Sequence, residues 1–146
     1  MFVLLIRHAD PASGDDNPGL SAAGTKRAAT LARMLAGTGV TAIFTSSLRR
    51  TKDTAAPLAA QLTITPSVID DDFATAAAQV KAAGSAAATA GACVLVVGHS
   101  NTVPEIIKAL GGPANVTIGA TEFDRMFVLH GPASGAGSLL SMLYGV

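Results

Sequence analysis

The chain has few of the residues that stabilise small secreted domains or bind nucleic acids. One of its 146 residues is cysteine (Cys93), which excludes a framework of intramolecular disulfides. Tryptophan is absent and Tyr144 is the single tyrosine, so the sequence offers no series of aromatic rings on which bases could stack. Ten Lys and Arg residues balance ten Asp and Glu residues, which leaves no excess positive charge to bind nucleic acid or an anionic membrane. We therefore expect neither of them as a partner.

Long hydrophobic runs are also missing. No apolar run approaches the roughly 18 residues that a transmembrane helix needs. The N-terminal run Phe2–Ile6 has no basic region before it and no small-residue cleavage site after it, so it predicts a buried strand and not a signal peptide. The length, with 49% hydrophobic residues, suits a single domain over residues 1–146. We expect a cytoplasmic protein, and the sequence makes no prediction of its oligomeric state.

Several apolar segments have the pattern of buried strands. Phe2–Ile6 and Cys93–Val97 are continuous aliphatic runs without polar alternation, typical of parallel strands covered on both faces, and Thr41–Thr45 is a shorter run of the same kind. Segments with helical periodicity lie between them. Arg125–His130 and Ser138–Tyr144 predict two late strands joined by a turn rich in Gly, Pro and Ser. This alternation predicts an α/β fold: a three-layer α/β/α sandwich with a mostly parallel central sheet and helices on both faces.

Polar segments directly follow three of the expected strands, at residues 7–10, 45–51 and 98–102. In an open α/β sheet, ligands bind beyond the carboxyl ends of the strands, so these segments are the first candidates for function. They hold two of the three histidines and several arginines. Guanidinium groups match phosphate oxygens bidentately, and an imidazole that is neutral near pH 7 can attack phosphorus. The segments therefore predict a site for an anionic tetrahedral group.

Four motifs carry a resemblance to a known family. They are Arg7-His8-Ala9 after the first strand, Leu20-Ser21-Ala22-Ala23-Gly24, the segment TSSLRRTKDTA at 45–55, and VVGHSNT at 96–102. In their order and placement at strand ends they resemble the histidine phosphatase superfamily, whose fold is called phosphoglycerate mutase-like. The resemblance extends from Phe2 to about Leu110. Ala9 replaces the glycine of the usual Arg-His-Gly signature, as in the small SixA-like members.

The resemblance implies a role for each matching residue. His8 is expected to be the nucleophile that forms a phosphohistidine, while Arg7, Arg49 and His99 bind the phosphoryl oxygens and stabilise the transition state. Arg49 is chosen for its place after Ser-Ser-Leu, and Arg50 is expected to project from another side of the helix into solvent. No cofactor or metal is expected, because the arginines supply the positive charge.

The remaining candidates are less clearly assigned. Ser100 and Asn101 could donate hydrogen bonds to phosphate or cap the following helix, in which Thr102 and Glu105 have the spacing of a capping box. Larger relatives carry a general acid in an insertion that this chain is too short to contain. Asp70, the first residue after an expected strand at Ser67–Ile69, is the favoured replacement and Asp72 the next. Three consecutive aspartates also fit a solvated turn at a helix N-terminus.

The sequence favours a phosphatase that hydrolyses phosphate monoesters or a phosphorylated protein through a phosphohistidine on His8. A small open site also suits phosphohistidine on a protein, which needs access. The alternative from another class is a non-catalytic module that binds a phosphorylated ligand. A phosphomutase is disfavoured, because it needs a closed site and the chain has no room for a lid. The loops Asp10–Gly19 and Gly111–Thr121 are expected to set specificity.

Overall fold

The computed structural model describes residues 1–86, 91–131 and 137–145. A six-stranded sheet forms its centre, with the strand order β3-β2-β4-β1-β5-β6. The strands are β1 (Phe2–Arg7), β2 (Val40–Thr45), β3 (Ser67–Val68), β4 (Cys93–Gly98), β5 (Arg125–His130) and β6 (Ser138–Leu143). The first four strands are mutually parallel, and β5 and β6 are added antiparallel at one edge. The mostly parallel sheet predicted from the sequence is confirmed.

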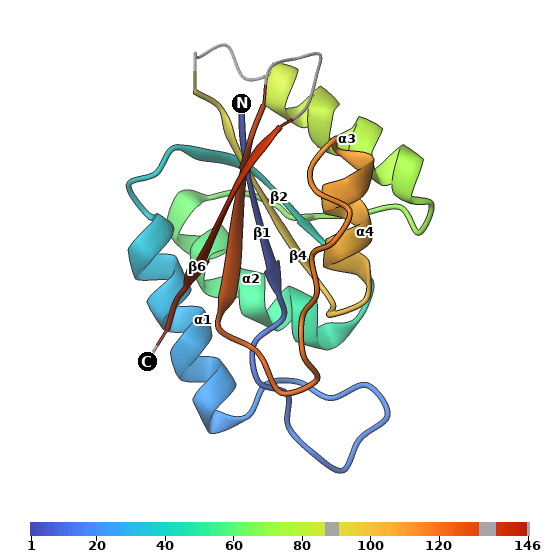
Figure 1. Cartoon of the computed structure of the whole chain (residues 1–146). Coiled ribbons are helices and arrows are strands. Elements are labelled where there is room, and N and C mark those ends of the chain that lie inside the picture. The colour runs from blue at the N-terminus through green and yellow to red at the C-terminus, as the bar shows by residue number, and fades with distance from the viewer. Residues whose placement is uncertain (87–90, 132–136, 146) are drawn as a thin grey trace.

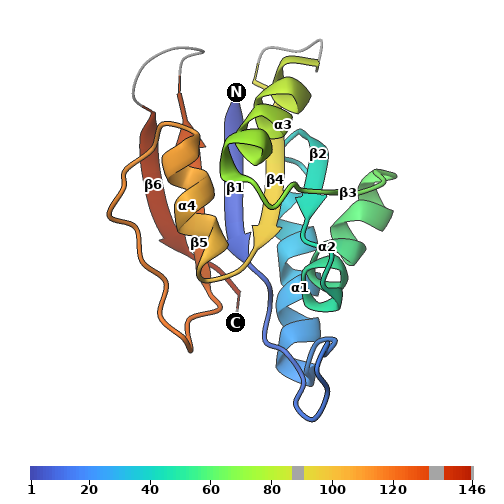
Figure 2. The same ribbon diagram turned by 90° about the vertical axis from the view of Figure 1, so that its right-hand side faces the viewer.

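Two helices cover each face of the sheet (Figures 1 and 2). On one face lie α1 (Ala22–Leu35) and α2 (Arg49–Leu62), and on the other α3 (Phe73–Ala86) and α4 (Thr102–Ala109). The predicted three-layer α/β/α sandwich is therefore also confirmed. The predicted turn between β5 and β6 lies largely at residues 132–136, outside the described residues. Among the residues that are described, no helix has the length and apolar character needed to cross a membrane.

The core explains why β1 and β4 are apolar at every position. Leu4 and Ile6 of β1 pack against α1 and α2, whereas Val3 and Leu5 pack on the opposite face with α3 and α4. All six residues of β4 are buried. Because successive strand residues point to opposite faces, a strand covered on both faces needs apolar residues throughout.

Helix α1 begins where the sequence predicts. Ser21 is the N-cap, and its hydroxyl accepts a hydrogen bond from the Gly24 N–H at 3.1 Å. The capping box expected at α4 is not formed, because α4 begins at Thr102 and the preceding Asn101 makes no side-chain cap bond. The Thr102 hydroxyl instead accepts from the backbone N–H of His99 at 2.9 Å.

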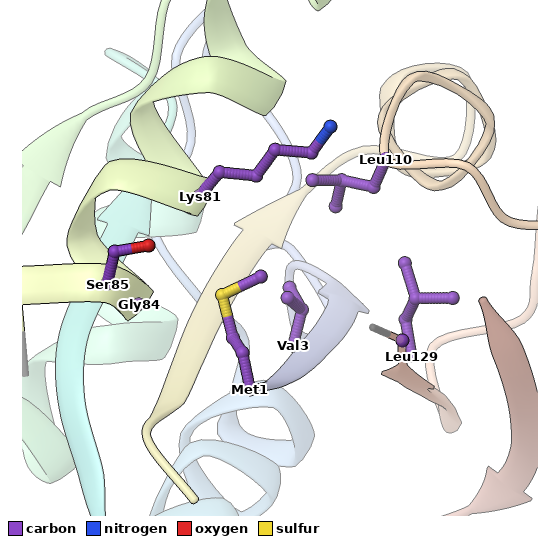
Figure 3. Close-up of a pocket in the computed structure, with 8 residues that line it drawn as sticks. Met1, Val3, Lys81, Gly84, Ser85, Leu110 and Leu129 are labelled. Atoms are coloured by element: carbon purple, nitrogen blue, oxygen red, sulfur yellow. The ribbon is translucent and has the colours of Figure 1, made fainter. Parts of the chain in front are cut away.

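Sheet register brings the polar segments together. Arg7 at the end of β1 pairs with Gly98 at the end of β4, and Val97 pairs with Thr45 at the end of β2. The three strands therefore end side by side, at the lower edge of the sheet in Figure 2. At the opposite, amino end lies a cavity of about 240 Å³ between α3, α4, β1 and β5, which we call the amino-end cavity; Figure 3 shows Met1, Val3, Lys81, Leu110 and Leu129 around it.

Candidate active site

His8 lies immediately beyond β1, and its side chain is almost wholly buried. Its backbone N–H donates to the Gly98 carbonyl at 2.8 Å, which ties the end of β1 to the end of β4. The ring Nδ1 lies 2.8 Å from the Ala9 carbonyl oxygen. A carbonyl can only accept, so Nδ1 carries the proton and the neutral ring has its lone pair on Nε2. This tautomer places the lone pair on Nε2, which accepts a hydrogen bond from Arg50.

The local electrostatics keep this imidazole neutral. Burial and, to a smaller extent, the charges of Arg7 and Arg50 lower the pKa of His8 to about 4, against the opposing effect of the hydrogen bond to Ala9. At neutral pH the ring therefore retains its free electron pair, although it lies among cations.

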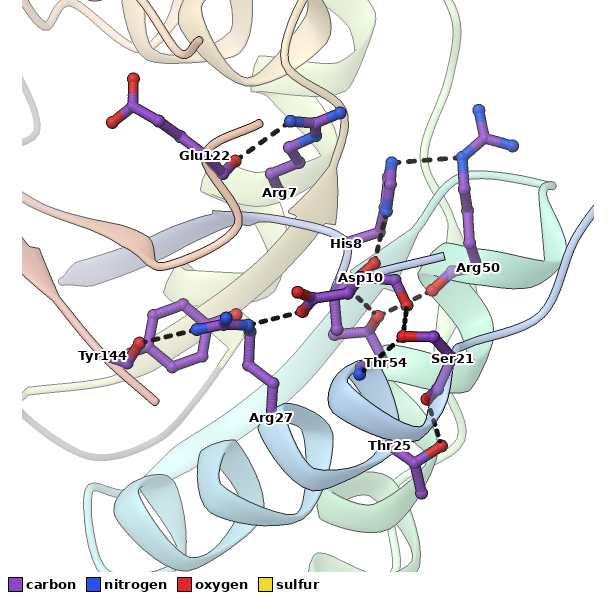
Figure 4. A network of polar contacts seen from close by, with 12 residues as sticks. Arg7, His8, Asp10, Ser21, Thr25, Arg27, Arg50, Thr54, Glu122 and Tyr144 are labelled. Atoms are coloured by element: carbon purple, nitrogen blue, oxygen red, sulfur yellow. Dashed lines mark hydrogen bonds and ion pairs between the residues drawn. The ribbon is translucent and has the colours of Figure 1, made fainter. Parts of the chain in front are cut away.

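The structure corrects the expectation for the two arginines of α2. Arg50 Nε donates to His8 Nε2 at 3.2 Å, and Arg50 is half-buried (Figure 4). Arg49 is exposed and forms an ion pair with Asp53 at 3.3 Å. The prediction that Arg50 points into solvent is wrong, and Arg49 is not among the residues that line the pocket around His8.

The rotation of α2 about its axis is the physical reason. Arg50 shares a helix face with Thr54, four residues later, which is fully buried and accepts a hydrogen bond from the Ala9 N–H at 2.9 Å. Arg49 shares its face with the polar Asp53. The sequence contains a pattern that indicates this orientation of Arg50: Thr54 and Leu58 follow it at helical spacing and mark the buried face of α2.

His99 follows β4 and is held through its backbone and its ring. Its Nε2 lies 2.8 Å from the Ser46 hydroxyl, which is also 2.8 Å from the Thr51 hydroxyl. Burial, together with the smaller effects of the charges of His8, Arg50 and Arg7, lowers the pKa of His99 to about 4. The ring centroids of His8 and His99 are 5.3 Å apart. Ser46 and Thr102 thus orient a site residue, a role that the sequence analysis did not assign to them.

Arg7 approaches the site from the end of β1. Its Nη1 donates to the carbonyl oxygens of Gly119, Ala120 and Glu122 at 2.8 to 3.1 Å, and its guanidinium carbon lies 4.0 Å from the centre of the Phe123 ring. Burial lowers the pKa of Arg7 from its usual value, and the charge of Arg50 adds to that effect. The chain around residues 119–122 therefore fixes the position of Arg7.

A second group of contacts supports the segment that carries His8 (Figure 4). Asp10 and Arg27 form a half-buried ion pair at 2.7 Å, and the Asp10 carbonyl accepts hydrogen bonds from the backbone N–H and the hydroxyl of Ser21. Burial alone would raise the pKa of Asp10, but the hydrogen bond and charge of Arg27 outweigh it and lower the pKa. A Cβ at Gly24 would lie 2.1 Å from the Asp10 oxygen, so the close approach of α1 requires glycine.

A pocket of about 270 Å³ opens above His8, and we call it the phosphate pocket. Its lining includes Arg7, His8, Arg50 and His99. Ser100 and Asn101 also line it, at the point where β4 passes into α4. The structure therefore brings together all the residues that were expected to bind the phosphoryl group or attack it, except Arg49, and adds Arg50.

The acidic candidates lie in a neighbouring cavity of about 280 Å³, which we call the side pocket. Asp70 lines it, and one carboxylate oxygen of Asp70 accepts from the Asp72 N–H at 2.8 Å. Asp72 does not line either pocket; its carboxylate accepts from the backbone N–H and the hydroxyl of Thr75 in the first turn of α3. These bonds lower the pKa of Asp72 and mark it as a helix-capping residue.

Comparison with known proteins identifies the family. Residues 3–78, more than half of the chain, match the family model described as the histidine phosphatase superfamily, branch 1. No curated protein sequence matches the chain. Within the described parts of the chain, no three His, Cys, Asp or Glu side chains are grouped so that they could hold a metal ion.

Solved structures share the fold over nearly their whole length. The protein histidine phosphatase SixA complexed with tungstate has a TM-score of 0.75 and 21% identity, covering 98% of this chain and 97% of that one. A mycobacterial glucosyl-3-phosphoglycerate phosphatase has a TM-score of 0.70 and 17% identity, covering 99% and 98%. A phosphoserine phosphatase from Entamoeba histolytica has a TM-score of 0.68 and 14% identity, covering 98% and 96%. Together with the family match and the residues gathered at the strand ends, they lead to one conclusion: the chain belongs to branch 1 of the histidine phosphatase superfamily.

Proposed function

We propose that the chain is a phosphatase that hydrolyses phosphate monoesters, or a phosphorylated protein, through a covalent phosphohistidine on His8. The observation that carries this proposal is the state of the His8 ring. Its Nδ1 proton is held by the Ala9 carbonyl, and its Nε2 lone pair faces a pocket lined by Arg7, Arg50 and His99. A neutral nucleophile surrounded by cations is suited to attack an anionic phosphorus centre.

In the first step, the phosphoryl group of the substrate enters the phosphate pocket. Arg50 transfers its Nε–H hydrogen bond from His8 Nε2 to a phosphoryl oxygen, which frees the lone pair. Nε2 then attacks phosphorus as the bond to the leaving oxygen breaks. Arg7, Arg50 and His99 stabilise the negative charge on the equatorial oxygens, and each such group typically contributes a few kcal/mol to lowering the barrier.

Arg7 has a feature that supports this role. Its side chain lines the phosphate pocket, and three carbonyl oxygens accept from its Nη1. The guanidinium group is therefore held in place before a phosphoryl group binds, which lowers the cost of ordering it. His99 contributes through Nδ1, since its Nε2 is engaged by Ser46.

The leaving oxygen requires a proton, and we assign Asp70 to this role. Asp70 lines the side pocket, which shares Leu48, His99 and Thr102 with the phosphate pocket, so its carboxyl group borders the space that the leaving group would occupy. In the second step, the carboxylate accepts a proton from water as the oxygen attacks phosphorus. The P–N bond breaks, phosphate leaves and Nε2 regains its lone pair.

A phosphorylated protein is a candidate substrate because the phosphate pocket is open at the surface beyond the strand ends. SixA, whose fold is shared, is a protein histidine phosphatase. The alternative is a module that binds a phosphorylated ligand without turnover. It is favoured by the exposed position of Asp70 and by the engagement of its carboxylate with the Asp72 N–H.

The test is hydrolysis of p-nitrophenyl phosphate between pH 5 and 8 in EDTA, with phosphohistidine trapped under alkaline conditions. We expect turnover without added metal, and a loss of at least about 10⁴-fold in kcat together with loss of the trapped species in His8→Ala. Comparable hydrolysis by wild type and His8→Ala would contradict the mechanism. Saturable binding of vanadate without turnover of aryl phosphates or a phosphohistidine protein would support the binding module instead.

A further inference from the structure

The phosphate pocket and the side pocket lie next to each other. Leu48, His99 and Thr102 line both cavities. A phosphoryl group held at His8 therefore places its organic substituent at the boundary between them. The inference below rests on the proposed function, since it concerns the group that the phosphoryl transfer releases.

The two cavities differ in charge. The phosphate pocket is lined by Arg7 and Arg50, whereas none of the residues lining the side pocket, all from the described part of the chain, is Lys or Arg. The side pocket has carboxylates instead, from Asp70 and Asp71, both exposed at its edge. A second anionic group on the substrate would meet these like charges and find no cation to bind it.

Four apolar side chains line the side pocket beside its polar residues. Leu48 precedes α2, Ile69 follows β3, Phe73 is the first residue of α3, and Ile106 comes from α4. A volume of about 280 Å³ is at the small end for a ligand pocket, which fits a group the size of a single ring and not an extended chain.

We propose that the side pocket selects the leaving group of the substrate, and that this group is compact, apolar or aromatic, and neutral or positively charged. The favoured substrates are thus phosphate monoesters or phosphoramidates whose organic part carries no carboxylate or second phosphate. Asp71 is the specificity-determining residue of this pocket, since Asp70 is assigned to proton transfer. Specificity then depends on residues 69–73 in addition to the two loops expected from the sequence.

The test compares kcat/KM for three aryl phosphates: phenyl phosphate, 4-(aminomethyl)phenyl phosphate and 4-carboxyphenyl phosphate. We expect wild type to prefer the aminomethyl ester over the carboxy ester by about tenfold or more, because the carboxylates of Asp70 and Asp71 attract a cationic substituent and repel an anionic one. Asp71→Lys should remove or reverse this preference and leave competitive inhibition by inorganic phosphate unchanged.

Glu105→Lys is the matched control, because Glu105 is exposed, lies outside the two loops, lines neither pocket and changes the net charge equally. Equal kcat/KM for the two charged esters, or equal shifts in Asp71→Lys and Glu105→Lys, would contradict the inference but not the proposed phosphatase activity. Failure to hydrolyse all three esters would contradict the proposed function, and the inference with it.

A second pair of variants tests the apolar lining. Phe73→Ala should raise KM for phenyl phosphate several-fold while the inhibition constant of inorganic phosphate stays constant. Phe2→Ala, at the amino end of β1, is the control for loss of a partly exposed phenylalanine. An unchanged KM in Phe73→Ala, or an equal rise in Phe2→Ala, would contradict binding of the leaving group in this pocket.

Discussion

At the carboxyl end of the sheet, the phosphate pocket of about 270 Å³ is lined by two histidines and two arginines. At the amino end, the cavity of about 240 Å³ is lined mainly by apolar side chains, with Lys81 as the charged residue (Figure 3). The two hollows are alike in volume, so size does not distinguish a site from a packing gap. The strands β1, β2 and β4 begin with apolar residues and are followed by polar ones, and the candidate site lies where these three strands end.

Among all the variants at the two ends of the sheet, Arg50→Ala should cause the largest loss of activity. Arg50→Ala should lower kcat/KM for p-nitrophenyl phosphate by about 10²–10³-fold, because it removes a charged donor at the reacting group. Arg49→Ala, one residue away, should change kcat/KM by less than about threefold, since an exposed ion pair contributes little. A larger loss of kcat/KM in Arg49→Ala than in Arg50→Ala would support the prediction from the sequence that Arg49 binds the phosphoryl group.

Glycine substitutions compare the packing at the two ends. Gly24→Ala should lower the free energy of unfolding by about 1–3 kcal/mol, because the new Cβ meets the backbone of Asp10 at 2.1 Å. Activity should also fall, since Asp10 is two residues from His8.

Gly84→Ala at the amino-end cavity is the matched variant. Its Cβ would meet the sulfur of the flexible Met1 side chain, which can move, and alanine stabilises the interior of α3 by about 0.5–1 kcal/mol. We expect a net change in stability below about 1 kcal/mol, measured by urea denaturation. An equal loss in both variants would show that the amino end is packed as strictly as the carboxyl end.

The pH dependence of stability should originate at the carboxyl end. His8 and His99 have pKa values of about 4, whereas an unfolded histidine titrates near 6.5. The unfolded chain therefore binds protons first, so stability is fully present above pH 6.5 and is lost progressively as the pH falls towards 4. The stability that comes from the lowered pKa of Asp10 is present throughout this pH range. It is lost only at still lower pH, where the Asp10 carboxylate becomes protonated.

NMR titration of the ring protons of His8 and His99 measures this directly, and urea midpoints at pH 7 and pH 5 measure its effect on folding. Arg50→Ala should raise the pKa of His8 by removing a nearby cation, and Arg49→Ala should not. Ring titration near pH 6.5 in the wild type, or a urea midpoint equal at both pH values, would contradict the electrostatics described here.

The smallest effect is expected for Lys81→Ala. Lys81 lines the amino-end cavity and takes no part in the site at the opposite end of the sheet. The kcat/KM of the Lys81→Ala variant should stay within about twofold of the wild-type value. A tenfold or greater loss of kcat/KM in a folded Lys81→Ala variant would show that the two ends are coupled. It would contradict the conclusion that activity depends on the carboxyl end alone.

Much of the fold and part of the site could be predicted because they depend on local patterns. β1 and β4 are apolar throughout since both of their faces are covered, and Ser21 caps α1 as its position suggests. His8 and His99 directly follow these strands, so strand register alone brings them together. The assignment of Arg49 failed because adjacent helix residues differ by about 100° in direction, and the packing of Thr54 and Leu58 decides which of them faces inward.

By itself, the sequence determined the α/β architecture and the strand ends at which the polar residues gather, because burial patterns and motif order are written along the chain. Tertiary structure decided the tautomer of His8, the choice of Arg50 over Arg49, and the use of Thr102 to hold His99 in place of a capping box. It also placed an acidic, apolar pocket beside a cationic one. The choice of Arg50 and the placement of the two pockets depend on contacts between segments that are distant in sequence, which exist only once the layers have packed. The bonds of His8 to Ala9 and of His99 to Thr102 are local in sequence, but they need the backbone conformation found where the packed strands end.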